Sequence, residues 1–442
     1  MRMKPIKDIK FWWRRITSAL VLLFALFFFV YPALTCAWVL LDPAVRTTGQ
    51  SRLITFWFRQ TAGRYERWAD RFLADQRAAQ LNPDHVAATE WPMFGSVFFL
   101  LTAEQLHAEG RVDARSGTIR RAVDRARDIV ISPDTATWVR HKWGDAYLEH
   151  QNVFYRMLLM MGLTAHARIT GSTADRDLLH TQWTGLAREL LAAPHHVLDD
   201  YPGECYPVDV VWSVAAIQRA AALEGTNAHD LAAALMQSLD GHLRAPDGLP
   251  AYQVDAPTGY CFQPSRGCGN SGLLLFAPDL NAERARAWYQ VYASNFWKST
   301  DWIAGFTEMS RDQTNQVMDV DSGPVMAGIG SVASAFGIGA ARRAGDLDRV
   351  AQLTWQAVAC SWPTPAGLLI PGLMGHFAVD GWCLGEVALL FSMTRPLPAG
   401  ELPAATAHAP GIAWGLLLFY SAAGAWFIYR EGPSLRRGGP RN

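Results

Sequence analysis

The chain has 442 residues, which is enough for one large domain or two ordinary ones. Its 40 basic and 40 acidic residues cancel to a formal net charge of +0, which argues against nucleic-acid binding, because that needs a clustered basic face. Charged residues make up only 18% of the chain, below the usual quarter, and two apolar ends explain much of the deficit.

Residues 1–15 form a basic tail, and residues 16–41 carry no charge at all. About 20 apolar residues span a bilayer as a helix, so residues 16–41 predict a transmembrane helix, with Pro32 as a kink. A cleavable signal peptide is the alternative, but its apolar core is normally shorter, whereas here the apolar run continues through Trp38. The basic tail places the N-terminus in the cytoplasm by the positive-inside rule.

A second uncharged stretch covers residues 411–429 and is followed by a basic tail at residues 430–442. The Pro- and Ala-rich residues 395–410 predict a linker that returns the chain to the bilayer. Both basic tails fall on one side, as two spans require. The sequence therefore predicts a bacterial inner-membrane protein with two lipid-embedded helices, both termini cytoplasmic and its main domain periplasmic.

Residues 42–394 predict one all-α domain, because apolar residues recur at helical spacing and period-2 alternation is scarce. The clearest predicted helices cover residues 116–130, 152–169, 177–191, 209–223, 282–297 and 325–344. The small residues between 326 and 341 allow close approach of neighbouring backbones, as inner helices of a crowded barrel need. Repeated helix pairs predict an (α/α)6 toroid of about twelve helices in an inner and an outer ring.

Six cysteines fit an oxidising compartment without assigning any bond. Cys36 falls in the first span, and Cys261 and Cys268 are close enough in sequence to close a short disulfide loop. The remaining cysteines, Cys205, Cys360 and Cys383, either pair or stay reduced. No CxxC, His-rich or Gly-rich phosphate motif is present, so no metal or cofactor is expected.

Acidic residues in Gly- and aromatic-rich patches are the candidate catalytic groups, since a proton donor and an acceptor flanking a substrate support elimination, isomerisation or glycoside hydrolysis. They are Glu204, Asp145, Asp319, Asp321 and Asp209. The side chains beside them are the candidate substrate-binding groups: Trp143, Tyr147, Cys205, Tyr206 and Tyr260. No histidine neighbours Cys205 in sequence to activate it as a nucleophile.

Several of these acids also have a structural interpretation. Asp145 and Asp209 stand at the starts of predicted helices, where a carboxylate caps free backbone amides. One of Asp319 and Asp321 is expected to cap the helix that follows them. Glu204, on a turn made by Pro202 and Gly203, has no such structural role and is the strongest candidate.

Two further groups are weaker candidates. Glu308 and Arg311 lie three residues apart and predict a solvated ion pair. Trp382 and Glu386 stand in another glycine-containing segment.

Residues 91–348 resemble the linalool dehydratase/isomerase family. The resemblance rests on Trp143-Gly144-Asp145, the helix from Asn152 to Ser172, the patch from Tyr201 to Asp209 leading into Ser213-Val214-Ala215, and Asp319-Val320-Asp321 leading into Ala333-Ser334-Ala335-Phe336. It implies an (α/α)6 barrel and chemistry on an alcohol, without a cofactor.

The family's catalytic histidine falls on Leu158, and one of its two cysteines falls on Val211. Cys205 matches the other cysteine only with a shifted alignment. The resemblance therefore implies a divergent member whose site is based on carboxylates rather than thiols.

Three functions remain open at this point. The first is a lyase or isomerase that acts on a small alcohol. The second is an envelope glycan hydrolase or lyase, by analogy with other (α/α)6 enzymes and with the compartment. The third is a non-catalytic envelope protein that binds a ligand.

Overall fold

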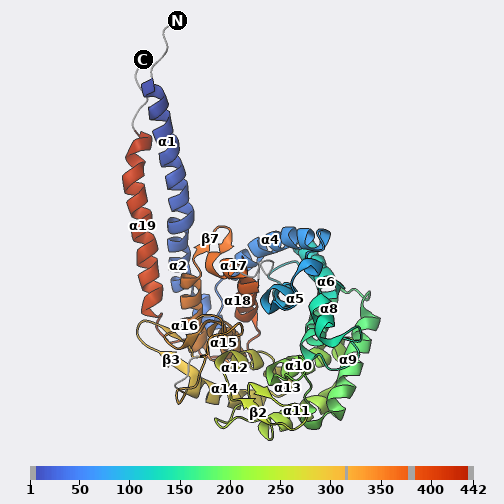
Figure 1. Cartoon of the computed structure of the whole chain (residues 1–442). Helices are drawn as coiled ribbons and strands as arrows, with labels where there is room; N and C mark the ends of the chain where they lie inside the picture. The colour runs from blue at the N-terminus through green and yellow to red at the C-terminus, as the bar shows by residue number, and fades with distance from the viewer. Residues whose placement is uncertain (1–5, 314–316, 377–383, 437–442) are drawn as a thin grey trace.

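The computed structural model describes residues 6–313, 317–376 and 384–436. The described chain is mostly helical, with a rounded body from which two long helices rise side by side (Figure 1). Its helices are α1 (Ile6–Ala25), the π-helix η1 (Leu26–Val30), α2 (Tyr31–Leu41), α3 (Pro43–Thr48), α4 (Ile54–Ala74), the 3-10 helix η2 (Arg77–Gln80), α5 (Val86–Ala108), α6 (Gly117–Ile131), α7 (Thr137–Trp143), α8 (Val153–Thr170), α9 (Arg176–Ala192), the 3-10 helix η3 (Pro194–His196), α10 (Pro207–Leu223), α11 (His229–Asp240), α12 (Gly267–Leu273), α13 (Ala277–Leu280), α14 (Ala282–Phe296), α15 (Ser331–Ala344), α16 (Leu347–Cys360), α17 (Leu369–His376), α18 (Leu384–Thr394) and α19 (Gly411–Arg436).

The described strands are short and form separate antiparallel two-stranded hairpins. They are β1 (Gln253–Val254) with β2 (Cys261–Gln263), β3 (Trp297–Ser299) with β4 (Ala304–Phe306), β5 (Val325–Met326) with β6 (Ile329–Gly330), and β7 (Pro363–Thr364) with β8 (Gly367–Leu368).

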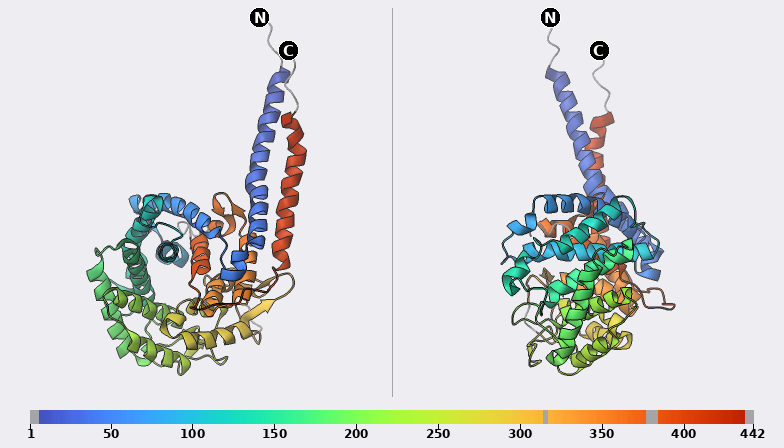
Figure 2. Two further views of the ribbon diagram at one scale, coloured as in Figure 1. Left: turned by 180° about the vertical axis from the view of Figure 1, so that it is seen from behind. Right: turned by 90° about the vertical axis from the view of Figure 1, so that its right-hand side faces the viewer.

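The two long helices are α1, continued through η1 into α2, and α19, and their free ends lie at the same end of the molecule (Figure 2). Both are long and apolar enough to cross a membrane, over Phe11–Leu41 and Gly411–Leu435. They contact each other near that end, where Ser18 Oγ donates to Glu431 at 2.7 Å and Arg15 donates to the Leu435 carbonyl at 2.9 Å. The pairing satisfies polar groups that would otherwise face an apolar surface.

The lower part of the first long helix packs on the body rather than standing free. α2 contacts α16 and β7, and it buries Cys36 and Val39. Trp355 of α16 donates its indole N–H to the Val39 carbonyl at 3.1 Å. The chain then turns at Asp42, whose side chain caps α3 by accepting from Ala44 N at 3.0 Å.

The helices of the body curve around α5, which is seen nearly end-on (Figure 1). α5 packs against α8 and α18, α10 packs against α8 and α12, and α15 packs against α12 and α18. Their shared core is aromatic: Phe98 stacks on Phe391 with ring centroids 4.7 Å apart, and Trp212 meets Phe276 edge-on, also at 4.7 Å. Burial of such rings stabilises the inner packing strongly.

Small residues let α15 approach its neighbours closely. A Cβ on Gly337 would lie 2.4 Å from the Phe306 ring, and one on Gly339 would lie 2.4 Å from the Leu275 side chain. Both distances are far inside van der Waals contact, so a larger residue would force the helices apart. The small-residue stretch predicted for an inner helix therefore has a direct packing reason.

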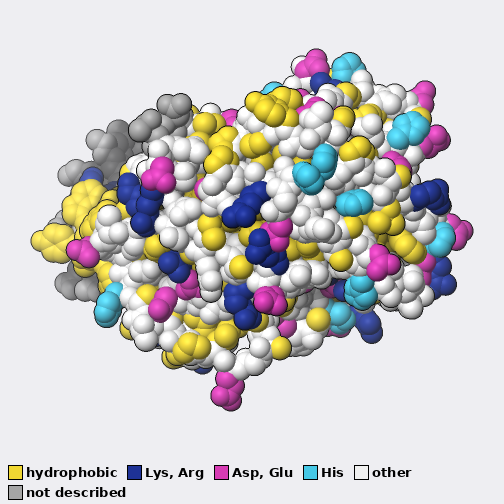
Figure 3. Space-filling model, turned by 90° about the horizontal axis from the view of Figure 1, so that it is seen from below, with side chains coloured by type: hydrophobic (Ala, Val, Ile, Leu, Met, Phe, Trp, Pro, Cys, Tyr) yellow, Lys and Arg dark blue, Asp and Glu magenta, His cyan; other side chains and the backbone are white. Residues whose placement is uncertain are grey.

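Further helices pack against the set formed by α5, α8, α10, α12, α15 and α18. α6 packs on α5 and α8, α9 packs on α8 and α10, and α14 and α16 pack on α15. The sequence of α6 fits this position, because Val123, Ala126 and Val130 are buried on one face and arginines occupy the other. The face seen in Figure 3 carries acidic and basic side chains interspersed, without a large patch of one sign.

One predicted helix begins later than the sequence indicates. The helix predicted over residues 325–344 starts only at Ser331, and the residues before it form the hairpin β5–β6. Ala327 and Gly328 both take positive φ, 51° and 82°, which makes the tight turn of that hairpin and excludes a helix there.

Candidate functional site

Four carboxyl groups from distant parts of the chain lie close enough for their charges to interact. They form the carboxylate cluster: Glu90 near the start of α5, Asp200 in the loop before α10, Asp209 in the first turn of α10, and Asp321 in the loop before β5. Asp209 interacts with Asp321 and with Asp200, and Glu90 interacts with Asp209 and Asp321. Like charges this close favour the protonated acid on at least one member.

Asp209 is one of the acids whose pKa this environment raises. Burial raises its pKa to about 8, and the negative charge of Asp321 adds to the shift. The N-terminus of a helix favours a carboxylate electrostatically, so desolvation and repulsion outweigh that attraction here. One interpretation of the sequence expected Asp209 to cap α10, and the structure contradicts it. Tyr206 holds the cap position and Pro207 begins the helix.

Asp200 is held by the turn that carries Glu204. Asp200 N donates to the Glu204 carbonyl at 2.8 Å, and Tyr206 N donates to Asp200 Oδ2 at 2.8 Å. Trp143 also contacts Asp200, because its indole N–H donates to the Asp200 carbonyl at 3.2 Å. Asp200 is 1% exposed, and burial followed by repulsion from Asp209 raises its pKa well above the usual range.

Glu90 is the buried acid near the start of α5. It is 8% exposed, and burial, followed by repulsion from Asp321 and Asp209, raises its pKa well above the usual range. Phe94 follows four residues later on the same face of α5 and packs against Phe98 and Trp212, with ring centroids 4.4 and 6.1 Å away. An acid next to aromatic carbon is kept neutral because its charged form is poorly solvated.

Asp321 is the exposed member of the cluster. Its residue is exposed to solvent, yet enough protein surrounds the carboxylate for desolvation to raise its pKa. Tyr252 donates its hydroxyl to Asp321 Oδ2 at 2.5 Å, which stabilises the ionised form and limits the shift. Tyr206 packs on the Tyr252 ring at 5.4 Å and donates to Glu204 Oε2 at 2.9 Å, so Glu204 stands beside the cluster at the exposed side.

An arginine borders the cluster. Arg266 Nε donates to Glu308 at 2.8 Å, and its two terminal nitrogens donate to the two oxygens of Asp319 at 2.9 and 3.0 Å. Burial acts to raise the pKa of Asp319, but the bonds from Arg266 outweigh it and leave that pKa below its usual value. Asp319 therefore stays ionised and neutralises the arginine, and it is unsuited to hold a proton.

The prediction of a solvated Glu308–Arg311 pair is wrong. Glu308 is 1% exposed and pairs with Arg266, whereas Arg311 donates to the Trp297 carbonyl at 2.6 Å. Neither Asp319 nor Asp321 caps α15, because that helix begins at Ser331 after Gly330. Asp319 instead closes a local turn by accepting from Ser322 N at 3.0 Å.

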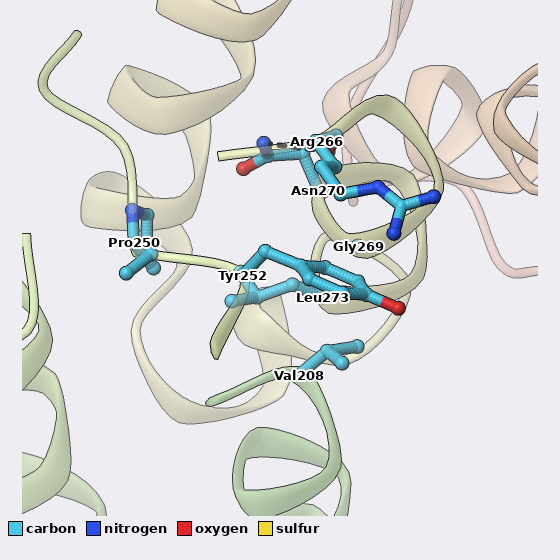
Figure 4. A pocket seen from close by; sticks show the side chains of 8 residues that line it. Val208, Pro250, Tyr252, Arg266, Gly269, Asn270 and Leu273 are labelled. Carbon is cyan, nitrogen blue, oxygen red and sulfur yellow. Dashed lines mark hydrogen bonds between the residues drawn. The ribbon is translucent and has the colours of Figure 1, made fainter. Parts of the chain in front are cut away.

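A small pocket opens beside the arginine (Figure 4). The Tyr252 ring lies between the Arg266 side chain and Val208, with the guanidinium carbon 4.4 Å from the ring centroid. The volume open to the centre of a water molecule is about 10 Å³, roughly what a single water needs. Asn270 completes the polar side of this pocket.

The cysteines do not pair as the sequence allowed. Cys261 and Cys268 are both free thiols. Cys261 donates to the Gln263 carbonyl at 3.3 Å in β2, whereas Cys268, at the start of α12, donates to Glu308 Oε1 at 3.1 Å. The two thiols have different partners on different elements. Cys205 is also free and fully buried, and burial raises its pKa well above the usual value.

The remaining predicted site residues lie apart from the cluster. Asp145 is exposed in the turn after α7, and Tyr147 packs on Tyr155 with ring centroids 5.5 Å apart. Tyr260 is 65% exposed in the β1–β2 hairpin. Glu386 is buried in α18 and pairs with Arg64 at 2.6 Å, while Trp382 and Cys383 lie outside the described residues.

Four residues at this site were not singled out in the sequence: Glu90, Asp200, Tyr252 and Arg266. Glu308 was a weaker candidate, expected in a pair with Arg311. Glu90 carries a usable sequence signal, since it is the sole charged residue between Asp84 and Glu104. Among the described residues, no group of three or more His, Cys, Asp or Glu is placed to hold a metal ion.

Comparison of the chain with models of known protein families gives no match, and comparison with curated proteins gives none at the threshold for a significant match.

Proposed function

We propose that this chain is a membrane-anchored acid–base enzyme of the linalool dehydratase/isomerase type, with its site in the cleft of an (α/α)6 barrel. The inner ring would consist of α5, α8, α10, α12, α15 and α18. The pairwise packing supports this, because it runs through these six helices in chain order and returns from α18 to α5.

The two apolar helices would anchor the barrel in the inner membrane with both termini in the cytoplasm. Three observations support this: the length and hydropathy of both helices, the basic residues at both ends, and the position of both termini at the same end of the molecule. Exposed Trp12 and Trp13 near one end of the apolar stretch, and Trp38 and Trp414 near the other, fit the two aromatic belts of a spanning segment.

The proposed reaction is elimination of water from an alcohol, or the related isomerisation. A protonated carboxyl would donate to the hydroxyl oxygen as the C–O bond breaks, and an ionised carboxylate would take a proton from the neighbouring carbon. The products are an alkene and water. The carboxyl that donated its proton ends ionised, and the carboxylate that accepted a proton ends protonated. Such chemistry needs one neutral and one charged acid together near neutral pH.

The observation that carries the proposal is the pair Asp209 and Asp321. Asp209 holds its proton up to about pH 8, and its carboxyl interacts with that of Asp321. Asp321 is stabilised in its ionised form by Tyr252. Asp209 is thus the proposed acid and Asp321 the proposed base, with Glu90 as a second neutral acid. Phe94, which is partly exposed and packs on Phe98 and Trp212, offers apolar surface that suits a hydrocarbon tail better than a sugar.

The test is a substrate screen with the purified full-length protein in detergent or lipid nanodiscs, against isoprenoid alcohols and envelope glycans. We expect an alkene or rearranged alcohol to form from an alcohol with an apolar tail. Asp209→Asn should abolish that activity, whereas Asp145→Asn, on the exposed turn after α7, should leave it unchanged. Turnover of glycans alone would replace the proposal with the hydrolase alternative.

A further inference from the structure

A corner of the body reaches the middle of both apolar helices. This apolar corner consists of residues 359–373, which cover the end of α16, the hairpin β7–β8 and the start of α17. Tyr420 of α19 donates its hydroxyl to the Ala359 carbonyl at 3.0 Å. Trp362 donates its indole N–H to the Phe28 carbonyl, in η1, at 2.8 Å.

Both contact points lie deep within the uncharged stretches. Phe28 is near the middle of residues 16–41, and Tyr420 is the middle of residues 411–429. A helix rises 1.5 Å per residue, so Phe28 lies roughly 18 Å and Tyr420 roughly 14 Å from the basic ends of their stretches. The hydrocarbon core of a bilayer is about 30 Å thick. A membrane that begins at the basic ends therefore includes the level of Ala359 and Trp362.

The composition of the corner fits that depth. No Asp, Glu, Lys or Arg occurs from Val350 to Val379. Ile370 and Leu373 on α17 are 40% and 41% exposed, and Cys360 is exposed too. Figure 1 shows β7 and α17 on the side of the body from which α1 and α19 rise. In water this surface would leave apolar side chains exposed without a partner.

The hairpin β7–β8 also satisfies its own backbone groups, which hydrocarbon demands. Its two strands pair with each other, and Leu368 N donates to Glu386 Oε1 at 3.0 Å inside the body. Thr364 donates its hydroxyl to the Gly367 carbonyl at 2.9 Å. Non-helical backbone is tolerated at membrane depth where protein covers it, as here.

We propose that the apolar corner is a third membrane contact, inserted into the outer half of the bilayer beside the two spanning helices, with Ile370 and Leu373 against lipid acyl chains. The inference rests on the proposed anchoring by α1 and α19. The partner is the hydrocarbon of the bilayer, not a protein. The contact would add to the packing of α2 and α19 on the body in fixing the orientation of the body on the membrane surface.

The test uses the full-length wild-type protein in phosphatidylcholine nanodiscs with a photoactivated carbene precursor dissolved in the lipid. Peptide mass spectrometry should find residues 359–373 modified to an extent similar to that of residues 411–429. The control is α9, whose Leu191 is 48% exposed on the body and should stay unmodified. Modification of the corner no greater than that of α9, with both spans modified, would overturn the inference alone. Absence of modification from the spans as well would overturn the anchoring on which it rests.

A second measurement uses the native thiols. Cys360 lies in the corner and Cys261 in the hairpin β1–β2 of the body. A charged, water-soluble maleimide should modify Cys360 at least about tenfold more slowly than Cys261 in nanodiscs, because the lipid shelters it and disfavours its thiolate. Equal rates would contradict insertion of the corner.

Discussion

The Arg266 guanidinium lies 2.8 Å from the Glu308 carboxylate, and both side chains are almost completely buried. The pair joins the start of α12 to the segment after β4 and supports the wall of the candidate site. Breaking a buried pair by removing one partner strands the other charge in a poorly solvated place.

Arg266→Met should therefore lower the free energy of unfolding by about 3 kcal/mol, measured by denaturant titration of the full chain in detergent. The matched control is Arg125→Met. Arg125 pairs with Asp70 at 2.6 Å, but both side chains are nearly half exposed, so the expected cost is below about 1 kcal/mol. Equal losses in the two variants would show that the buried Arg266–Glu308 pair contributes no more to the free energy of unfolding than an exposed pair.

The carboxylate cluster should make folding less favourable as pH rises. In the unfolded chain these acids ionise near their ordinary pKa of about 4, whereas in the folded protein Asp209 keeps its proton up to about pH 8. The folded state thus binds more protons between those values, and stability falls with rising pH across that window. Asp209→Asn should flatten the fall in melting temperature between pH 5 and 8. A slope unchanged by the substitution would contradict the assignment.

Tyr252→Phe should change the pH dependence of activity rather than only its size. The hydroxyl of Tyr252 stabilises the ionised form of Asp321, so its removal raises the pKa of that carboxyl. The acidic limb of the kcat/KM profile, where the base becomes protonated, should then move to higher pH. Tyr260→Phe is the control, since Tyr260 is exposed in the β1–β2 hairpin. An identical profile in Tyr252→Phe and wild type would remove Asp321 from the role of base.

Cys261 and Cys268 should be found as thiols in protein purified without reductant. Non-reducing peptide mapping should recover both as separate alkylated peptides. Cys268 should react more slowly, because it is buried against Glu308 and burial raises its thiol pKa well above the usual value. A peptide in which these two cysteines are linked would contradict the arrangement.

Helical periodicity located the main elements well, because buried faces repeat every three to four residues whatever the tertiary partners. The helix predicted over residues 152–169 is α8 (Val153–Thr170), and that over residues 282–297 is α14 (Ala282–Phe296). The start of α15 was missed because Gly, Ala and Ser are compatible with a hairpin as well as a helix. The turn at Ala327 depends on positive φ, which composition alone does not reveal.

The candidate site was harder to predict than the helices. Glu204, Asp209, Asp319 and Asp321 were selected from their glycine- and aromatic-rich surroundings, and the structure brings these four into one region, while Asp145 lies apart. The partners of these acids were not accessible to sequence reasoning. Arg266 and Glu308, for example, are 42 residues apart. They meet only because α12 packs against α15, which also contacts β4 and β6.

The most direct test of the central claim is the protonation state of Asp209, which needs no substrate. Infrared difference spectra between wild type and Asp209→Asn should show a protonated carboxyl band at pH 7 that belongs to Asp209. The band should disappear with a midpoint near pH 8, the pKa to which burial and Asp321 raise this group. A difference spectrum with only an ionised carboxylate at pH 7 would contradict an acid–base site built on this cluster.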